Sequence, residues 1–208
     1  GFVNGYTFQG CTRLAVKLDF ISGLLMKAAR ATGVETFRGV QAQIGEVIGW
    51  RNLFWSLSDA MACNPERWVG DAVLPSVRAS SAYRLFATEA YPAVRKIVEK
   101  VVASGLIYLP SHVRDFKNPE IDKYLQRYVR GSGGIDYKQR IKTMKLLWDA
   151  VGTEFGARHE LYEINYAGNF ELVRLFPLQL SEGNGDLKAM EALADACMAD
   201  YDENGWTD

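Results

Sequence analysis

The sequence predicts an all-α protein, a four-helix bundle with extra short helices. Three observations support this fold class. Apolar residues recur at spacings of three and four over several long segments, which is the period of one face of a helix. No series of segments alternates apolar and polar residues as half-buried strands do. No internal repeat recurs at a fixed period, so a solenoid or a propeller is excluded.

The first two predicted helices are long. In the first, apolar residues at positions 14, 18, 21, 25 and 28 share one face, and the helix ends before Gly33. The second begins near Glu35 and stops around Asn64, because the following proline disfavours helical backbone at that residue. Its first half contains Gly39, Gly45 and Gly49, which allow close approach either of another backbone or of a flat ligand.

The later helices are predicted over four further ranges. A short apolar segment, 106–110, fits a strand, a loop or a buried crossing segment. The four helical ranges are 76–104 with a kink at Pro92, 118–129, 136 toward 166, and 186–201.

Composition excludes several classes of protein. With 24 basic and 25 acidic residues the net charge is −1, so the chain shows no global electrostatic footprint for nucleic acid or an anionic membrane. No apolar run reaches the roughly 18 residues of a membrane span. Cys11, Cys63 and Cys197 are odd in number and far apart, which is typical of reduced thiols in a cytoplasmic protein. The chain starts at Gly1 with no signal-peptide pattern, and we expect it to be a fragment of a longer protein.

Two histidines, His112 and His159, limit the metal chemistry that the bundle can host. A di-iron bundle needs Glu-x-x-His pairs, but the residues three places earlier are Leu109 and Gly156. A zinc protease needs a second histidine where Glu163 stands. No metal site is therefore expected.

The segment 158–169 is the most informative polar stretch, because charges, amides, tyrosines and a glycine meet at a predicted helix end. Its amides and backbone N–H groups can present hydrogen bonds to a phosphate or a flavin ring edge. A helix C-cap with surface ion pairs explains the same residues. Arg13, Lys17 and Asp19 interrupt the apolar face of the first helix, and either pair across helices or line a cofactor groove.

Three blocks, 10–20, 38–46 and 155–169, occur in the order expected for one family. Together they closely resemble the C-terminal helical domain of the 4-hydroxyphenylacetate 3-monooxygenase family, which includes two-component chlorophenol and nitrophenol monooxygenases. The resemblance covers essentially all of residues 1–208. It implies a fold similar to the C-terminal domain of acyl-CoA dehydrogenases, with the family's N-terminal helical and middle β domains absent from this chain.

The resemblance also implies an activity. Family members take reduced FAD (FADH2) from a separate NAD(P)H-dependent flavin reductase, react it with molecular oxygen to a C4a-hydroperoxide, and hydroxylate a phenol. Chlorophenol members release halide. The resemblance further implies a cytoplasmic homotetramer assembled through the helical bundle, without a nucleic-acid or membrane partner.

Site residues follow by the same resemblance. The segment Asn165, Tyr166, Ala167, Gly168 and Asn169 matches the part of the family that touches FAD, and His159 faces the flavin or the substrate mouth. The groups that grip the phenol belong to the missing N-terminal part, so no catalytic residue is assigned in this chain.

Two alternatives remain at this point. An enzyme similar to 4-hydroxybutyryl-CoA dehydratase would need an iron–sulfur cluster held by cysteines and one histidine, and Cys11 has no histidine near it in sequence. A purely structural helical oligomerisation module would bind no cofactor.

Overall fold

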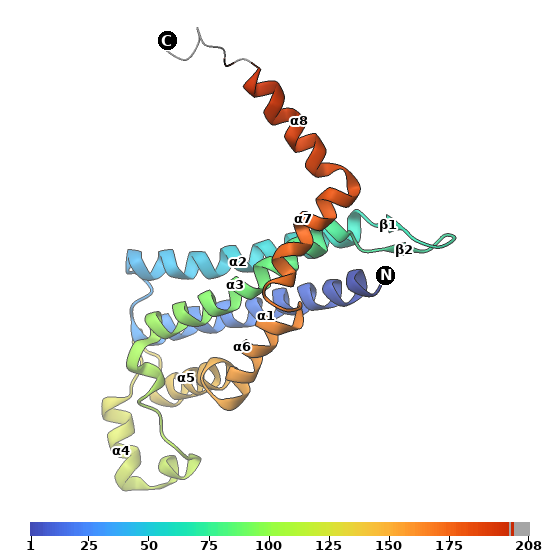
Figure 1. Cartoon of the computed structure of the whole chain (residues 1–208). Coiled ribbons are helices and arrows are strands. Elements are labelled where there is room, and N and C mark those ends of the chain that lie inside the picture. Colours follow the sequence, from blue (N-terminus) through green and yellow to red (C-terminus); the bar gives the residue numbers. More distant parts are fainter. Residues whose placement is uncertain (200, 202–208) are drawn as a thin grey trace.

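The computed structural model describes residues 1–199 and 201, which form eight α-helices, two 3₁₀ turns and one small hairpin. Three long helices, α1 (Phe2–Thr32), α2 (Arg38–Cys63) and α3 (Val77–Val102), pack side by side (Figure 1). The shorter α5 (Tyr137–Val151) packs on α1, and α6 (Glu154–Tyr166) packs against α3 and α5. The predicted all-α bundle is confirmed.

The core lies where the apolar faces of the long helices meet. Helix α1 buries a continuous stripe because its apolar residues recur every three or four positions. Gly33 ends this helix in the left-handed conformation at φ 75°, as the sequence predicts. The largest fully buried side chains are Tyr83, Tyr91, Phe54, Leu14, Leu18, Ile21, Leu25, Met61, Met144, Leu147, Glu163 and Val47.

Helix α1 begins at Phe2, earlier than its apolar periodicity indicates. The first two turns bury the polar residues Asn4 and Thr7. The amide of Asn4 donates to the carbonyl of Pro75 at 2.8 Å, and the hydroxyl of Thr7 donates to the carbonyl of Val3 at 2.6 Å. These bonds satisfy the polar groups inside the protein, so burial here leaves no apolar pattern in the sequence.

The predicted long helix from 136 toward 166 is wrong, because it is two helices. Helix α5 ends at Val151, and Thr153 caps α6 by accepting a hydrogen bond from the backbone N–H of Gly156. The ring of Trp148 lies over Gly152, where a Cβ would stand 2.3 Å from it. A break at this glycine therefore turns the chain and gives α6 its own direction.

Other elements were not predicted. Residues Glu66–Arg67 (β1) and Val73–Leu74 (β2) form an antiparallel hairpin, too short to leave an alternating pattern. Helix α7 (Leu172–Asn184) contains Pro177, a residue that weakens a helical prediction. For the segment 106–110, the loop among the three expected structures is found: Leu106 ends the 3₁₀ turn η1 (Ala103–Leu106), and residues 107–110 form a loop.

Two parts project from the bundle. Helix α4 (Pro119–Tyr128), with the 3₁₀ turn η2 (Val113–Lys117), forms a lobe on one side, and α8 (Asp186–Met198) extends from α7 on the other (Figure 1). Helix α8 ends earlier than predicted; residue 200 lies outside the described residues, and Tyr201 is not helical. Within the described part of the chain, no helix is both long and apolar enough to cross a membrane.

Candidate functional site

A cluster of charged side chains joins α1 to α6. At its centre the carboxylate of Glu163 is fully buried, and the guanidinium of Arg13 donates to it through Nη1 at 2.5 Å and Nη2 at 3.0 Å. The ammonium of Lys17 donates to the same carboxylate. Residues 13 and 17 are one helical turn apart, and so are 159 and 163, so each helix presents its pair on one face.

His159 completes the cluster. Its Nδ1 lies 2.8 Å from Nζ of Lys17, which acts as the donor. Burial and the nearby charge of Lys17 lower the pKa of His159 below its usual range. The imidazole is then neutral at physiological pH. Because Nδ1 accepts from Lys17, the proton of the ring is on Nε2, which can donate a hydrogen bond.

The two cations respond differently to this environment. Burial lowers the pKa of Lys17, although Glu163 opposes the effect. For Arg13, burial also acts to lower the pKa, but the hydrogen bond and charge of Glu163 outweigh it, and the pKa rises. With both cations protonated, the cluster carries an excess positive charge beside one buried carboxylate.

Aromatic rings surround the cluster. The guanidinium carbon of Arg13 lies 4.3 Å from the ring centre of Tyr162 and 5.5 Å from that of Tyr166. The two tyrosine rings stack at 4.6 Å, and the hydroxyl of Tyr166 donates to Oε1 of Gln9 at 3.1 Å. Such cation–π contacts hold Arg13 in place.

Two hollows meet at His159. One has a volume of about 430 Å³ and is lined by Arg13, Phe155, Arg158, His159 and Tyr162. The other, of about 130 Å³, is lined by Lys17, Phe20, Ile21, Tyr91, Ala150, Phe155 and His159. The larger volume lies within the range of small-molecule sites. Its aromatic walls and positive charge suit a planar ligand that carries negative charge.

The segment 165–169 lies at the C-terminal end of α6 and is tied to two other helices. The buried carbonyl of Ala167 accepts hydrogen bonds from Nε of Arg84 on α3 at 2.8 Å and from the hydroxyl of Tyr6 on α1 at 3.2 Å. Gly168 has φ 126°, and a Cβ there would stand 2.8 Å from Nη2 of Arg84. Only glycine fits this turn without strain.

The two asparagines of the segment are exposed. The amide nitrogen of Asn165 donates to the carbonyl of Leu161 at 2.8 Å, and Oδ1 of Asn169 accepts from the backbone N–H of Glu171 at 2.9 Å. Among the described residues, Oδ1 of Asn165 and Nδ2 of Asn169 have no hydrogen-bond partner. One acceptor and one donor are thus available to a polar ligand. Ala167 is buried, so it positions the segment and does not offer its side chain.

The structure brings some of the sequence-predicted site residues together and leaves others apart. His159 and the segment 165–169 lie on the same helix and its C-terminal end, whereas His112 lies apart and caps η2 by accepting from the N–H of Arg114. The role of Glu163 as counter-charge to Arg13 and Lys17 was missed. The sequence does contain a signal for this role: residues 13 and 17 are four positions apart, and so are residues 159 and 163. Within residues 1–199 and 201, no group of three or more histidine, cysteine, aspartate or glutamate side chains could hold a metal ion.

Solved structures define the class to which this fold belongs. The oxygenase component (HpaB) of 4-hydroxyphenylacetate 3-monooxygenase complexed with FAD matches with a TM-score of 0.87 and 24% identity, over 97% of this chain and 42% of that one. A 4-hydroxybutyryl-CoA dehydratase from N. maritimus matches with a TM-score of 0.73 and 16% identity, over 84% and 35%. The chain thus shares the helical fold of the corresponding parts of these proteins.

The family model described as 4-hydroxyphenylacetate 3-hydroxylase C terminal matches residues 1–202, and the chain belongs to this family. A 4-hydroxyphenylacetate 3-monooxygenase oxygenase component of Pseudomonas aeruginosa is 60% identical over 207 residues, which is 100% of this chain and 40% of the relative. A 4-nitrophenol 2-monooxygenase oxygenase component of Rhodococcus sp is 53% identical, with the same coverage. The chain therefore spans about two fifths of the length of these curated relatives.

Proposed function

We propose that this chain is the C-terminal helical domain of the oxygenase component of a two-component aromatic monooxygenase, which uses reduced FAD and molecular oxygen to hydroxylate a phenol. The observation that carries the proposal is the 60% identity to a 4-hydroxyphenylacetate 3-monooxygenase oxygenase component along the whole chain. The structural likeness to a dehydratase rests on 16% identity and supports the fold alone.

The names of the relatives narrow the substrate class. 4-Hydroxyphenylacetate and 4-nitrophenol are both phenols with a substituent para to the hydroxyl group, and positions 3 and 2 in the two names are both ortho to that hydroxyl. We therefore propose ortho hydroxylation of a para-substituted phenol. The partners are a separate NAD(P)H-dependent flavin reductase and further copies of the same protein in a homotetramer, and the enzyme works in the cytoplasm.

The residues of this chain fit the cofactor in three ways. Asn165 and Asn169 offer an acceptor and a donor, Gly168 and Ala167 shape the turn that presents them, and Arg13 and Lys17 place positive charge near His159. Reduced FAD, when bound, supplies the electrons that activate oxygen. A positive environment favours the anionic form of a reduced flavin.

Activity is tested on the complete protein, loaded anaerobically with reduced FAD and mixed with oxygenated buffer. With 4-hydroxyphenylacetate or 4-nitrophenol present, we expect a catechol product that contains one atom of labelled oxygen from ¹⁸O₂. Hydrogen peroxide in amounts equal to the oxidised FAD, with no catechol from any phenol tested, would contradict the proposal.

The flavin contact is tested by the double substitution Asn165→Ala and Asn169→Ala in the complete protein. Loss of two hydrogen bonds worth about 0.5–1.5 kcal/mol each predicts at least five-fold weaker binding of reduced FAD. Asn64→Ala is the matched control, because the amide of Asn64, like that of Asn165, donates to the carbonyl four residues earlier. Unchanged flavin affinity with intact assembly favours a purely structural module.

A further inference from the structure

Helix α8 is an amphipathic helix, most of whose apolar residues stay exposed within the described part of the chain. It has 13 residues, packs mainly against α7, and contains no buried residue. Met190, Leu193 and Met198 are each more than half exposed. Isolated helices shorter than about 12–15 residues are marginal in water, so a helix of this length requires packing against another surface.

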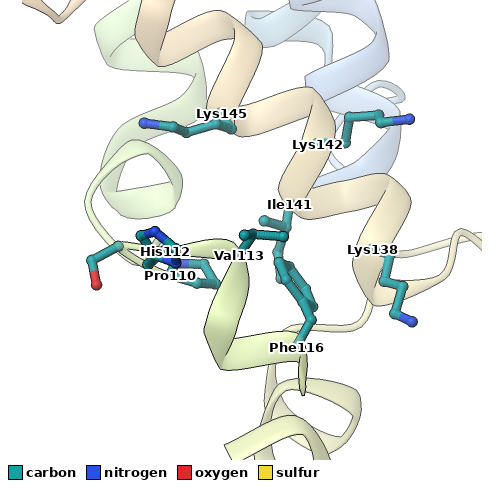
Figure 2. Close-up of a pocket in the computed structure, with 9 residues that line it drawn as sticks. Pro110, His112, Val113, Phe116, Lys138, Ile141, Lys142 and Lys145 are labelled. Carbon is teal, nitrogen blue, oxygen red and sulfur yellow. The ribbon is translucent and has the colours of Figure 1, made fainter. Parts of the chain in front are cut away.

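A hollow of about 450 Å³ lies between α5 and η2 on the other side of the bundle. Figure 2 shows Val113, Phe116 and Ile141 at its apolar centre. Lys138 and Lys142 extend from α5 to one side of this centre, and Lys145 extends to the other (Figure 2). No acidic residue lines the hollow, although Lys145 lies 3.5 Å from Asp149 further along α5. We name this surface the α5–η2 hollow.

The charges of α8 and of the α5–η2 hollow are complementary. Glu191 and Asp195 are four residues apart and share one face of α8. Lys138 and Lys142 have the same spacing on α5. Among the described residues, none of these four side chains takes part in an ion pair. An amphipathic helix that lays its apolar face in the hollow would bring the two carboxylates alongside the two ammonium groups.

The two surfaces cannot meet within one copy as it is folded, because α8 and the α5–η2 hollow lie on opposite sides of the bundle (Figure 1). Two copies related by a two-fold axis can satisfy both surfaces at once, since each gives its helix and receives the other. We propose that α8 of one copy docks in the α5–η2 hollow of a second copy. This inference rests on the self-association in the proposed function and is independent of its flavin chemistry.

Cross-linking tests the contact in the complete protein without flavin or substrate. In a Cys63→Ser background, Val113→Cys places a thiol in the hollow, and native Cys197 is an exposed thiol of α8. A short bismaleimide is expected to give covalent dimers that disappear when Cys197→Ser is added. The matched control is Val69→Cys, at an exposed position near the hairpin. Links within a single chain, or dimers no more abundant than in the control, would overturn the proposal.

A charge exchange provides the second test. Lys138→Glu with Lys142→Glu is expected to weaken association about ten-fold in a dilution series followed by sedimentation. Adding Glu191→Lys with Asp195→Lys is expected to restore it, which a folding defect would not allow. Circular dichroism confirms that each variant keeps its helices. The contact is contradicted if the two lysine substitutions leave association unchanged. It is also contradicted if association stays weak after the two acidic residues have been replaced by lysine. Either result leaves the hydroxylation proposal standing, because no step here measures turnover.

Discussion

Arg13 on α1 and Glu163 on α6 form a two-point ion pair between residues that are 150 positions apart in sequence. The carboxylate is fully buried, while a quarter of the Arg13 side chain remains exposed. Because the pair closes the contact between the first helix and the helix that carries His159, it links the stability of the fold to the shape of the site.

Glu163→Gln is expected to lower the free energy of unfolding by about 2–4 kcal/mol, because it leaves two cations around a neutral side chain. The loss is smaller than for a wholly buried pair, since Arg13 and Lys17 keep some solvent contact. Urea denaturation of the chain measures the effect. Glu154→Gln removes an exposed pair with Arg158 and should change stability by less than about 0.5 kcal/mol. Equal losses in the two variants would contradict the central role of Glu163.

Gly168→Ala is expected to destabilise the protein by about 1–3 kcal/mol and to weaken flavin binding. An alanine at φ 126° is strained, and its Cβ would press on Nη2 of Arg84. Gly183→Ala is the control, because Gly183 lies in α7 with nothing within 4 Å of an added Cβ. Alanine at this position should raise the free energy of unfolding by at most about 1 kcal/mol. Thermal unfolding of both variants checks the prediction. A stabilising Gly168→Ala would show that the turn tolerates a side chain.

The stability that depends on His159 should fall in acid. Burial and the charge of Lys17 lower its pKa in the folded protein below the ordinary 6.5. The unfolded chain therefore binds more protons than the native state below that pH, and protonation favours unfolding. The difference in unfolding free energy between the wild type and His159→Gln should be constant above about pH 7 and should move against the wild type as the pH drops below 6.5.

Denaturation curves at three values of pH from 7.5 to 5.5 measure this dependence. The same comparison in a Lys17→Met background should show a weaker slope, because one cause of the lowered pKa is then gone. A pH-independent difference between the two proteins would show that His159 titrates alike in the folded and unfolded states.

Cysteine reactivity should separate the core from the surface. Burial raises the pKa of Cys11 to about 12, and its thiol donates to the carbonyl of Phe54 at 3.2 Å. A thiol reagent at pH 8 should label the exposed Cys63 quickly and Cys11 only after unfolding. Mass spectrometry of labelled peptides distinguishes the sites. Rapid labelling of Cys11 in native protein would mean that the α1–α2 interface opens readily.

The sequence by itself determined the bundle and most helix positions. The stripe of Leu14, Leu18, Ile21 and Leu25 lies in the core because a period of three and four places these residues on one face, and Gly33 marks the end of α1 because glycine accepts the left-handed cap. The three blocks of resemblance also identified the family before any contact was known. Each of these signals can be found without knowing which helices pack together, because it depends on residues that are near one another in sequence or on the order of the three blocks.

Only the tertiary structure decided how the site is assembled. The break between α5 and α6 depends on Trp148 lying over Gly152 and on the cap of Thr153, neither of which alters the apolar period. From the sequence, Glu163 fits an exposed ion pair equally well, because a sequence cannot say which carboxylate will face which cation when two helices pack. Burial then gives that pairing its energy, since a charge removed from water needs a partner that folding alone can bring to it.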